Sequence, residues 1–189
     1  MSRGVIRTRR WTRVEYDRAV EAGIFQEDEP LELLAGRLVV AEPKPRPHAV
    51  AVGLVAEALR HALGPGWHVQ VRDPIALDRT SEPEPDVTVI RGPLRDYLRE
   101  HRAHPALVVE VADSSLRLDR RFTGHLYART AVPEYWIVNL PDRVLEVYRA
   151  PQRDGRRWKY GDIQILGPEA FVSPLAAPSA RIAVTDLLP

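Results

Sequence analysis

The sequence predicts one mixed α/β domain built around a single curved β-sheet. Two observations carry this prediction. Helical patterns dominate the first third of the 189-residue chain, and short β-branched or aromatic runs with two interspersed helical patches follow them. With 44% hydrophobic residues, the chain can also bury a core of ordinary size. We therefore expect a single domain over residues 1–189, in which the proline-interrupted residues 158–189 form a C-terminal extension of short strands and loops.

The first elements are predicted from capping and turn signals. Thr12 and Glu15 have the spacing of a capping box, and the apolar stripe that follows runs out at Gly23, which predicts a first helix. Residues 31–34 and 37–40 flank Ala35 and Gly36 and predict a tight hairpin. Three prolines then exclude regular structure until His48.

The remaining elements are predicted from hydrophobic periodicity. Apolar residues recur at helical spacing over residues 48–63, and the Gly-Pro-Gly sequence at 64–66 ends that helix. Strands are predicted where β-branched and aromatic residues concentrate, and two helical patches interrupt these runs. The predicted strands are 67–72, 86–90, 106–111, 135–139 and 144–149, and the predicted helices are 94–101 and 118–129.

Composition excludes several classes of protein. The chain has no Cys, which excludes disulfide frameworks, Cys-ligated metals and thiol nucleophiles. No segment approaches the ~18 apolar residues of a membrane span, so we expect a cytoplasmic protein without a membrane partner. The net charge is +1, from 27 Lys+Arg and 26 Asp+Glu, and all the basic residues except Lys44 and Lys159 are arginine. No HExxH, Gly-x-Ser-x-Gly or phosphate-loop motif occurs.

Two acidic residues are the best candidates for chemistry. Asp86 follows Pro85 at the opening of an apolar strand, so a rigid turn holds its carboxylate at the strand end. Glu110 lies inside the apolar run at 105–111, where a carboxylate is costly to bury unless it is paired or coordinates a metal. If the two strands are neighbours, both carboxylates can converge on one divalent ion, and oxygen ligands favour Mg²⁺ or Mn²⁺. The alternative is a simple turn at Asp86 and an ion pair between Glu110 and an arginine.

An ordered set of motifs resembles a known family. The set comprises LELLAGRLV at residues 31–39, Pro85-Asp86, PALVVEV at 105–111, Asp119 with Tyr127, and VPEYWIV at 132–138. Together they resemble the Uma-two family of the PD-(D/E)XK nuclease superfamily, over roughly residues 10–149. The resemblance implies a restriction-endonuclease-like central mixed sheet flanked by helices.

The resemblance also implies roles for four residues. Asp86 and Glu110 would be the metal-binding carboxylates, Glu32 an additional acidic residue near the metal, and His48 a polar residue at the edge of the active site. Without the family comparison, Glu32 is an exposed strand residue and His48 a cap of the second helix. The implied cofactor is Mg²⁺ or Mn²⁺, and the implied partners are DNA and further copies of the chain.

The sequence departs from the family pattern at one position. The family has a lysine in the pattern Asp-x-x-x-Lys-x-x-x-Tyr, and Thr123 stands at that lysine position here. Thr123 carries no charge, and Lys44 and Lys159 would need a coincidence of the fold to reach the site. The candidates for a compensating cation are Arg120, Arg121 and His125, although an arginine stays protonated and is a poor general base.

Two functions follow from these observations. The first is a divalent-metal-dependent endonuclease that hydrolyses DNA, with phosphate contacts from Arg117, Arg120 and Arg121 beside the site and from the arginine-rich N-terminus. Solvated charge on a helix face is the alternative explanation of these arginines. The second function is a catalytically weakened nuclease fold that binds nucleic acid, or assembles as an oligomer, without cleavage; Thr123 favours it.

Overall fold

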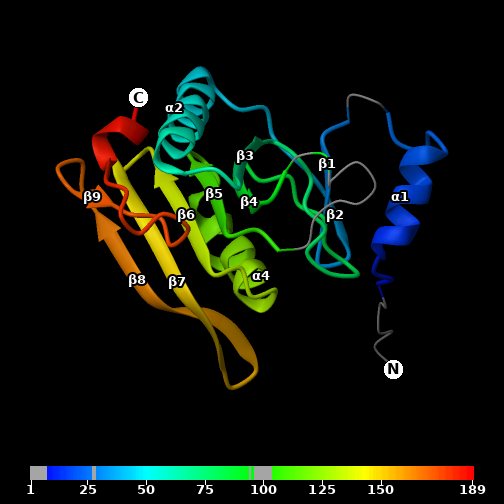
Figure 1. Cartoon of the computed structure of the whole chain (residues 1–189). Helices are drawn as coiled ribbons and strands as arrows, with labels where there is room; N and C mark the ends of the chain where they lie inside the picture. Colours follow the sequence, from blue (N-terminus) through cyan, green and yellow to red (C-terminus); the bar gives the residue numbers. More distant parts are fainter. Residues whose placement is uncertain (1–7, 27–28, 94, 96–103) are drawn as a thin grey trace.

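A computed structural model describes residues 8–26, 29–93, 95 and 104–189 of the chain. Its centre is a six-stranded mixed sheet with the strand order β3-β4-β5-β6-β7-β8, flanked by helices, which confirms the predicted fold class (Figure 1). The strands of this sheet are β3 (Trp67–Val71), β4 (Val87–Arg91), β5 (Leu107–Ala112), β6 (Glu134–Asn139), β7 (Val144–Asp154) and β8 (Arg157–Leu166). Two small antiparallel pairs stand outside it: β1 (Leu31–Leu34) with β2 (Arg37–Val40), and β9 (Phe171–Val172) with β10 (Ile182–Ala183).

The helices begin where local chemistry allows them to. They are α1 (Arg13–Glu21), α2 (Arg46–Ala62), α3 (Leu116–Leu118), the π-helical turn η2 (Asp119–Thr123), α4 (Gly124–Arg129) and the 3-10 turn η3 (Val184–Leu187). Thr12 and Glu15 form the predicted capping box of α1. Helix α2 starts two residues earlier than predicted, because Pro47 lies in the first turn, where the missing N–H has no helical partner in any case.

The sheet has one parallel pair, and its crossover carries helices. Strands β5 and β6 run parallel, and α3, η2 and α4 connect them, whereas every other neighbouring pair of the sheet is antiparallel. One apolar cluster packs α2 against the sheet through residues such as Val55 and Trp136. A second cluster packs α4 against the opposite face through residues such as Tyr127 and Tyr135. The crossover thus brings Tyr127 of α4 within hydrogen-bond distance of Glu110 on β5.

One region of the sheet differs from the prediction. Strands β7 and β8 form one long hairpin, so residues 157–166 are a single ten-residue strand at the edge of the central sheet, where short strands and loops closing an edge were predicted. Gly155 and Arg156 make the turn, with a positive φ of 58° at the glycine, and a glycine at the first turn position is a hairpin signal that the prediction missed. Apart from Arg95, the predicted helix at 94–101 lies outside the described residues.

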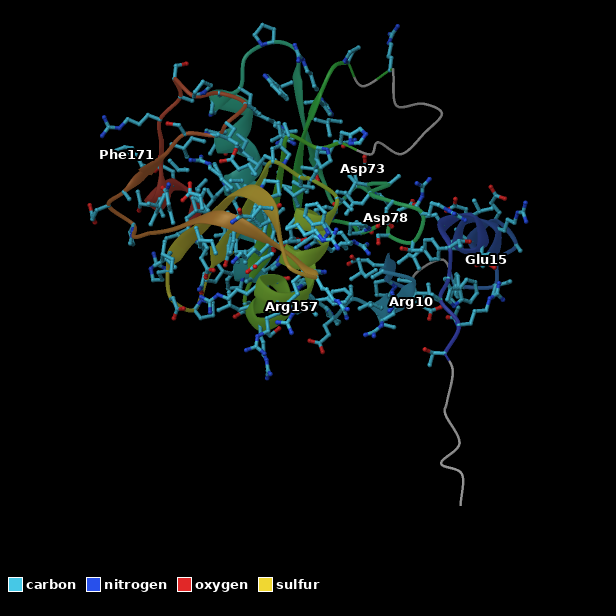
Figure 2. All side chains as sticks on the ribbon, turned by 90° about the horizontal axis from the view of Figure 1, so that it is seen from below. Arg10, Glu15, Asp73, Asp78, Arg157 and Phe171 are labelled. Carbon is cyan, nitrogen blue, oxygen red and sulfur yellow. The ribbon has the colours of Figure 1, made fainter. Side chains whose placement is uncertain are left out.

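The last residues complete the core under α2. Val172, Ile182, Val184 and Leu187 are buried in the same apolar cluster as that helix. Figure 1 shows the C-terminus beside α2, whereas α1 lies at the other end of the molecule, beyond β1 and β2. Figure 2 gives the same separation, with Phe171 at one end and Arg10 and Glu15 at the other. In the described segments, no helix has the length and apolar content that crossing a membrane requires.

Candidate metal and phosphodiester site

Strand pairing brings the two predicted carboxylates together. Strands β4 and β5 are antiparallel neighbours, and Val87 faces Val109 in their register. Asp86 is therefore beside Glu110 on the same face of the sheet, and the Asp86 backbone N–H donates to Glu110 Oε2 at 3.4 Å. The condition that the sequence prediction attached to a shared ion, namely neighbouring strands, is met.

Asp86 is held in place from several directions. Only 8% of the residue is exposed, and its Oδ2 accepts a hydrogen bond of 2.9 Å from the Val111 backbone N–H. The fully buried His48 places Nε2 3.0 Å from the same oxygen, although neither ring nitrogen has a hydrogen bond of good geometry. Arg72, a residue that the sequence prediction missed, places Nε 3.8 Å from Oδ1. His48 therefore contacts the Asp86 carboxylate from the start of α2 and does not line the cavity.

Glu110 is held by a tyrosine. The Tyr127 hydroxyl, carried by α4, donates to Glu110 Oε1 at 2.8 Å. Burial raises the pKa of Glu110 well above the usual carboxyl range, and the negative charge of Asp86 raises it further. In the described part of the chain Glu110 has no arginine partner, so the alternative of a Glu110–arginine ion pair is wrong.

Glu32 reaches the site because the β1–β2 hairpin docks on the segment that precedes Asp86. The Glu82 backbone N–H donates to the Leu33 carbonyl at 2.7 Å, and the Glu84 backbone N–H donates to Glu32 Oε2 at 3.3 Å. Burial raises the pKa of Glu32 to about 7, and the negative charges of Glu84 and Asp86 act in the same direction. Glu32 is thus a partly buried member of the acidic cluster and not an exposed strand residue.

Asp119 is an acidic residue of the site that the sequence prediction did not include. The π-helical turn η2 begins at Asp119, whose Oδ2 accepts a hydrogen bond of 2.6 Å from the Ser115 hydroxyl. Burial raises its pKa to about 6, and only 6% of the residue is exposed. Its position four residues before Thr123 in the family pattern was the available signal, but the pattern alone does not show that the carboxylate faces Glu110.

A cavity of about 330 Å³ joins these side chains. Six carboxylates and one lysine are its charged lining: Glu32, Glu42, Glu84, Asp86, Glu110, Asp119 and Lys44. Thr123 lines it as well, so the position of the family lysine faces the cavity as an uncharged hydroxyl. The expectation that Lys44 stays away from the site is wrong, because the connection between β2 and α2 passes over the cavity and carries Lys44 into its wall.

The predicted phosphate contacts lie elsewhere. Arg120 makes a bidentate ion pair with the buried Glu146, with contacts of 2.6 to 3.2 Å. Arg121 and His125 line a separate cavity of about 580 Å³ between α4 and β8, which Arg120 also lines. Arg117 is exposed and lines neither cavity. The structure thus does not place these cations in the acidic cavity.

The donor set fits a hard divalent cation. Burial and mutual repulsion raise the pKa values of Glu32, Glu110 and Asp119, and a cation would relieve that repulsion. Carboxylate oxygens are the ligands that Mg²⁺ prefers, together with backbone carbonyls and water. Within the described ranges no group of three or more His, Asp or Glu side chains is arranged to hold a metal by itself. An ion held by Asp86 and Glu110 would therefore complete its shell with backbone and water oxygens, as Mg²⁺ commonly does.

Comparisons with known proteins agree with this fold. A crystal structure of "a putative nuclease belonging to DUF820" from Anabaena variabilis ATCC 29413 is similar, with a TM-score of 0.69 and 16% identity over 94% of this chain and 97% of that chain. No curated protein matches the sequence. The model of the Uma2 family, described as "Putative restriction endonuclease", matches residues 14–185. Since that match covers most of the chain, the protein belongs to the Uma2 family of restriction-endonuclease-like proteins.

Proposed function

We propose that the protein is a divalent-metal-dependent endonuclease that hydrolyses phosphodiester bonds of DNA. The carrying observation is the pairing of Asp86 with Glu110 at neighbouring strand positions, in an open cavity whose carboxylates have raised pKa values. Buried carboxylates in this arrangement repel one another, and a protein retains them where a cation is to be bound. Membership of a nuclease family supports the same reaction class.

Each residue then has a definite task. Asp86 and Glu110 would hold Mg²⁺ or Mn²⁺, and a bound ion supplies positive charge that activates water and offsets the charge developing on a phosphodiester oxygen. The Val111 N–H and His48 fix the direction of the Asp86 carboxylate, and the Tyr127 hydroxyl fixes that of Glu110. Glu32 adds negative charge on the side of the cavity formed by the hairpin. These contacts preorganise the site before substrate arrives.

Plasmid cleavage tests the proposal. The purified protein is incubated with supercoiled DNA in Mg²⁺, Mn²⁺, Ca²⁺ or EDTA, beside the variants Asp86→Ala and Glu110→Gln. Glu57→Gln, on the exposed side of α2, is the matched control because it removes a carboxylate away from the cavity. The proposal is supported if nicking requires Mg²⁺ or Mn²⁺, is lost in Asp86→Ala and Glu110→Gln, and is retained in Glu57→Gln. Nicking that both variants retain would locate the activity elsewhere.

A second function is favoured by Thr123. An uncharged residue stands where the family lysine is expected, which fits a protein that binds nucleic acid, or assembles as an oligomer, without cutting it. Fluorescence anisotropy with labelled duplex DNA in Ca²⁺ separates this function from the first. Binding without any metal-dependent cleavage supports the second function, and light scattering of the same sample tests oligomer formation.

A further inference from the structure

Lys44 is a basic residue in the wall of a cavity that is otherwise lined by acidic charges. Among the described residues that line it, six are carboxylates and Lys44 is the one basic side chain. Lys44 makes no ion pair in the described part of the chain. An ammonium beside so many carboxylates would ordinarily form a close pair with one of them. Lys44 therefore stands in the cavity wall without a structural partner that would account for it.

The loop that carries Lys44 is stiff. Pro43 and Pro45 flank it, and the residue before a proline is held in extended geometry. Pro45 is also the N-cap of α2, with φ −72° and ψ 164°, so the helix anchors the loop. A stiff loop holds a long side chain over the cavity at a lower cost in entropy than a flexible one.

The charge of Lys44 acts on both sides of the cavity. It lowers the pKa of Glu32, which β1 carries, and also the pKa of Asp119, which η2 carries, against the raising effect of burial. These two carboxylates come from segments far apart in the sequence. The Lys44 ammonium therefore lies within electrostatic reach of both carboxylates.

The arginines near the site have carboxylate partners or line other cavities. Arg120 is paired with Glu146 and faces the other cavity, which Arg121 and His125 also line. Arg72 lies against Asp86 and lines an adjoining cavity. Thr123 lines the acidic cavity but carries no charge. Among the described residues of this cavity wall, Lys44 alone can offer a positive charge to a substrate.

We propose that Lys44 is a catalytic residue of this site, entering from the loop before α2 and taking the place of a lysine at Thr123. The proposal rests on the proposed nuclease function. During hydrolysis, a water oxygen bonds to phosphorus, one ester P–O bond breaks, and the water proton leaves to solvent while the departing sugar oxygen takes a proton from solvent. The Lys44 ammonium donates a hydrogen bond to a non-bridging phosphate oxygen, where negative charge increases in the transition state.

Cleavage kinetics on four variants test this proposal. They are Lys44→Ala, Lys44→Arg, Lys44→Ala combined with Thr123→Lys, and Lys159→Ala as the matched control, because Lys159 is the other lysine and lies in the β7–β8 hairpin. We expect Lys44→Ala to lower kcat about 100-fold with little change in KM, as loss of one transition-state donor does. Lysine at position 123 restores part of the loss, Lys44→Arg retains more activity than Lys44→Ala, and Lys159→Ala matches the parent.

A second readout does not depend on activity. Titration calorimetry with Mn²⁺ alone measures affinity for the carboxylates, which a neighbouring ammonium weakens. Lys44→Ala should bind Mn²⁺ about threefold to tenfold more tightly than the parent, and Lys159→Ala should not differ. Lys44 is exposed, so circular dichroism melting should show that its variants fold like the parent. Unchanged Mn²⁺ affinity in Lys44→Ala would place the ammonium away from the carboxylates and overturn the proposal.

The cleavage outcomes separate this proposal from the function on which it rests. If the parent cuts and Lys44→Ala cuts equally well, the role of Lys44 is overturned and the nuclease function stands. If the parent is inactive and Lys44→Ala combined with Thr123→Lys cuts, the metal site is competent but Lys44 does not serve it, which again overturns the role of Lys44. If no variant cuts with any metal, both proposals fail.

Discussion

Two cavities on either side of η2 and α4 differ in how their charges are compensated. The acidic cavity collects six carboxylates and Lys44. The basic cavity collects Arg120, Arg121, His125, Arg157 and Lys159. In the basic cavity three of the five have partners, since Arg120 pairs with Glu146, Lys159 with Asp154, and the His125 ring with the Trp158 carbonyl.

This difference indicates that the acidic cavity, and not the basic one, is the candidate active site. The Arg120–Glu146 pair joins η2 to β7, the Lys159–Asp154 pair joins β8 to β7, and neither pair needs a ligand. In the acidic cavity the carboxylates raise one another's pKa values, and no nearby cation neutralises them in full. A folded chain that keeps such repulsion has a destabilised site, and a bound cation would stabilise it. The predictions below test this contrast, from the largest expected effect to the smallest.

The largest effect is expected from the paired carboxylates. Asp86→Ala or Glu110→Gln should lower metal-dependent cleavage at least about 1,000-fold, because a bound ion supplies several kcal/mol of transition-state stabilisation. The melting temperature of metal-free Glu110→Gln should equal or exceed that of the parent, since one repelling charge is gone. A large loss of stability together with activity would make these residues structural instead.

The second prediction concerns pH. The pKa of Glu32 is raised from 4.5 to about 7 in the folded chain. The folded protein therefore binds more protons than the unfolded chain between these values, and its stability falls as pH rises through that window, by up to about 3 kcal/mol. Metal-free urea melts at pH 5 and pH 8 measure the fall. Glu32→Gln or saturating Mn²⁺ should remove much of it, and a metal-free parent that gains stability toward pH 8 would contradict the account.

The third prediction concerns the Arg120–Glu146 ion pair at the basic cavity. Arg120→Ala leaves Glu146, which is 1% exposed, without its bidentate partner. We expect a loss of about 2 kcal/mol in the free energy of unfolding, measured by urea denaturation, with unchanged cleavage per folded molecule. Double substitution with Glu146→Gln should recover part of the stability. Lost cleavage in a fully folded Arg120→Ala protein would instead give Arg120 a role at the substrate.

The smallest effect is expected from Arg121. Its guanidinium lines the basic cavity and has no ion pair in the described segments. If DNA contacts the exposed Arg121 side chain, Arg121→Ala should weaken binding about threefold and reduce the salt dependence of log K by about one. Anisotropy titrations at several salt concentrations measure both. Identical slopes for parent and variant would exclude Arg121 as a phosphate contact and leave the explanation of solvated charge.

The positions of Asp86 and Glu110 could be predicted because their sequence signals are local. Pro85 and the apolar runs placed Asp86 at a strand start and Glu110 within a strand. The antiparallel pairing of β4 with β5 then brings the two carboxylates together. The capping box of α1 and the turn at Ala35 and Gly36 were local in the same sense, and the structure confirms both.

The missed residues depend on contacts between distant segments. Lys44 reaches the cavity only because the β1–β2 hairpin docks through the backbone of Leu33 and Glu82. Asp119 faces Glu110 because the crossover returns over β5, and no local pattern gives that direction. Neither lysine stands at the family's lysine position, so the sequence predicted that only a coincidence of the fold would bring one to the site, and long-range docking places Lys44 there.

Anomalous diffraction from crystals grown with Mn²⁺ tests the central claim most directly, because it locates the ion without assuming any activity. The account predicts a peak in the acidic cavity, bonded to carboxylate oxygens of both Asp86 and Glu110, and no such peak in crystals of Asp86→Ala. A parent crystal with bound Mn²⁺ only at surface sites away from these two carboxylates, or with none at high occupancy, would contradict it.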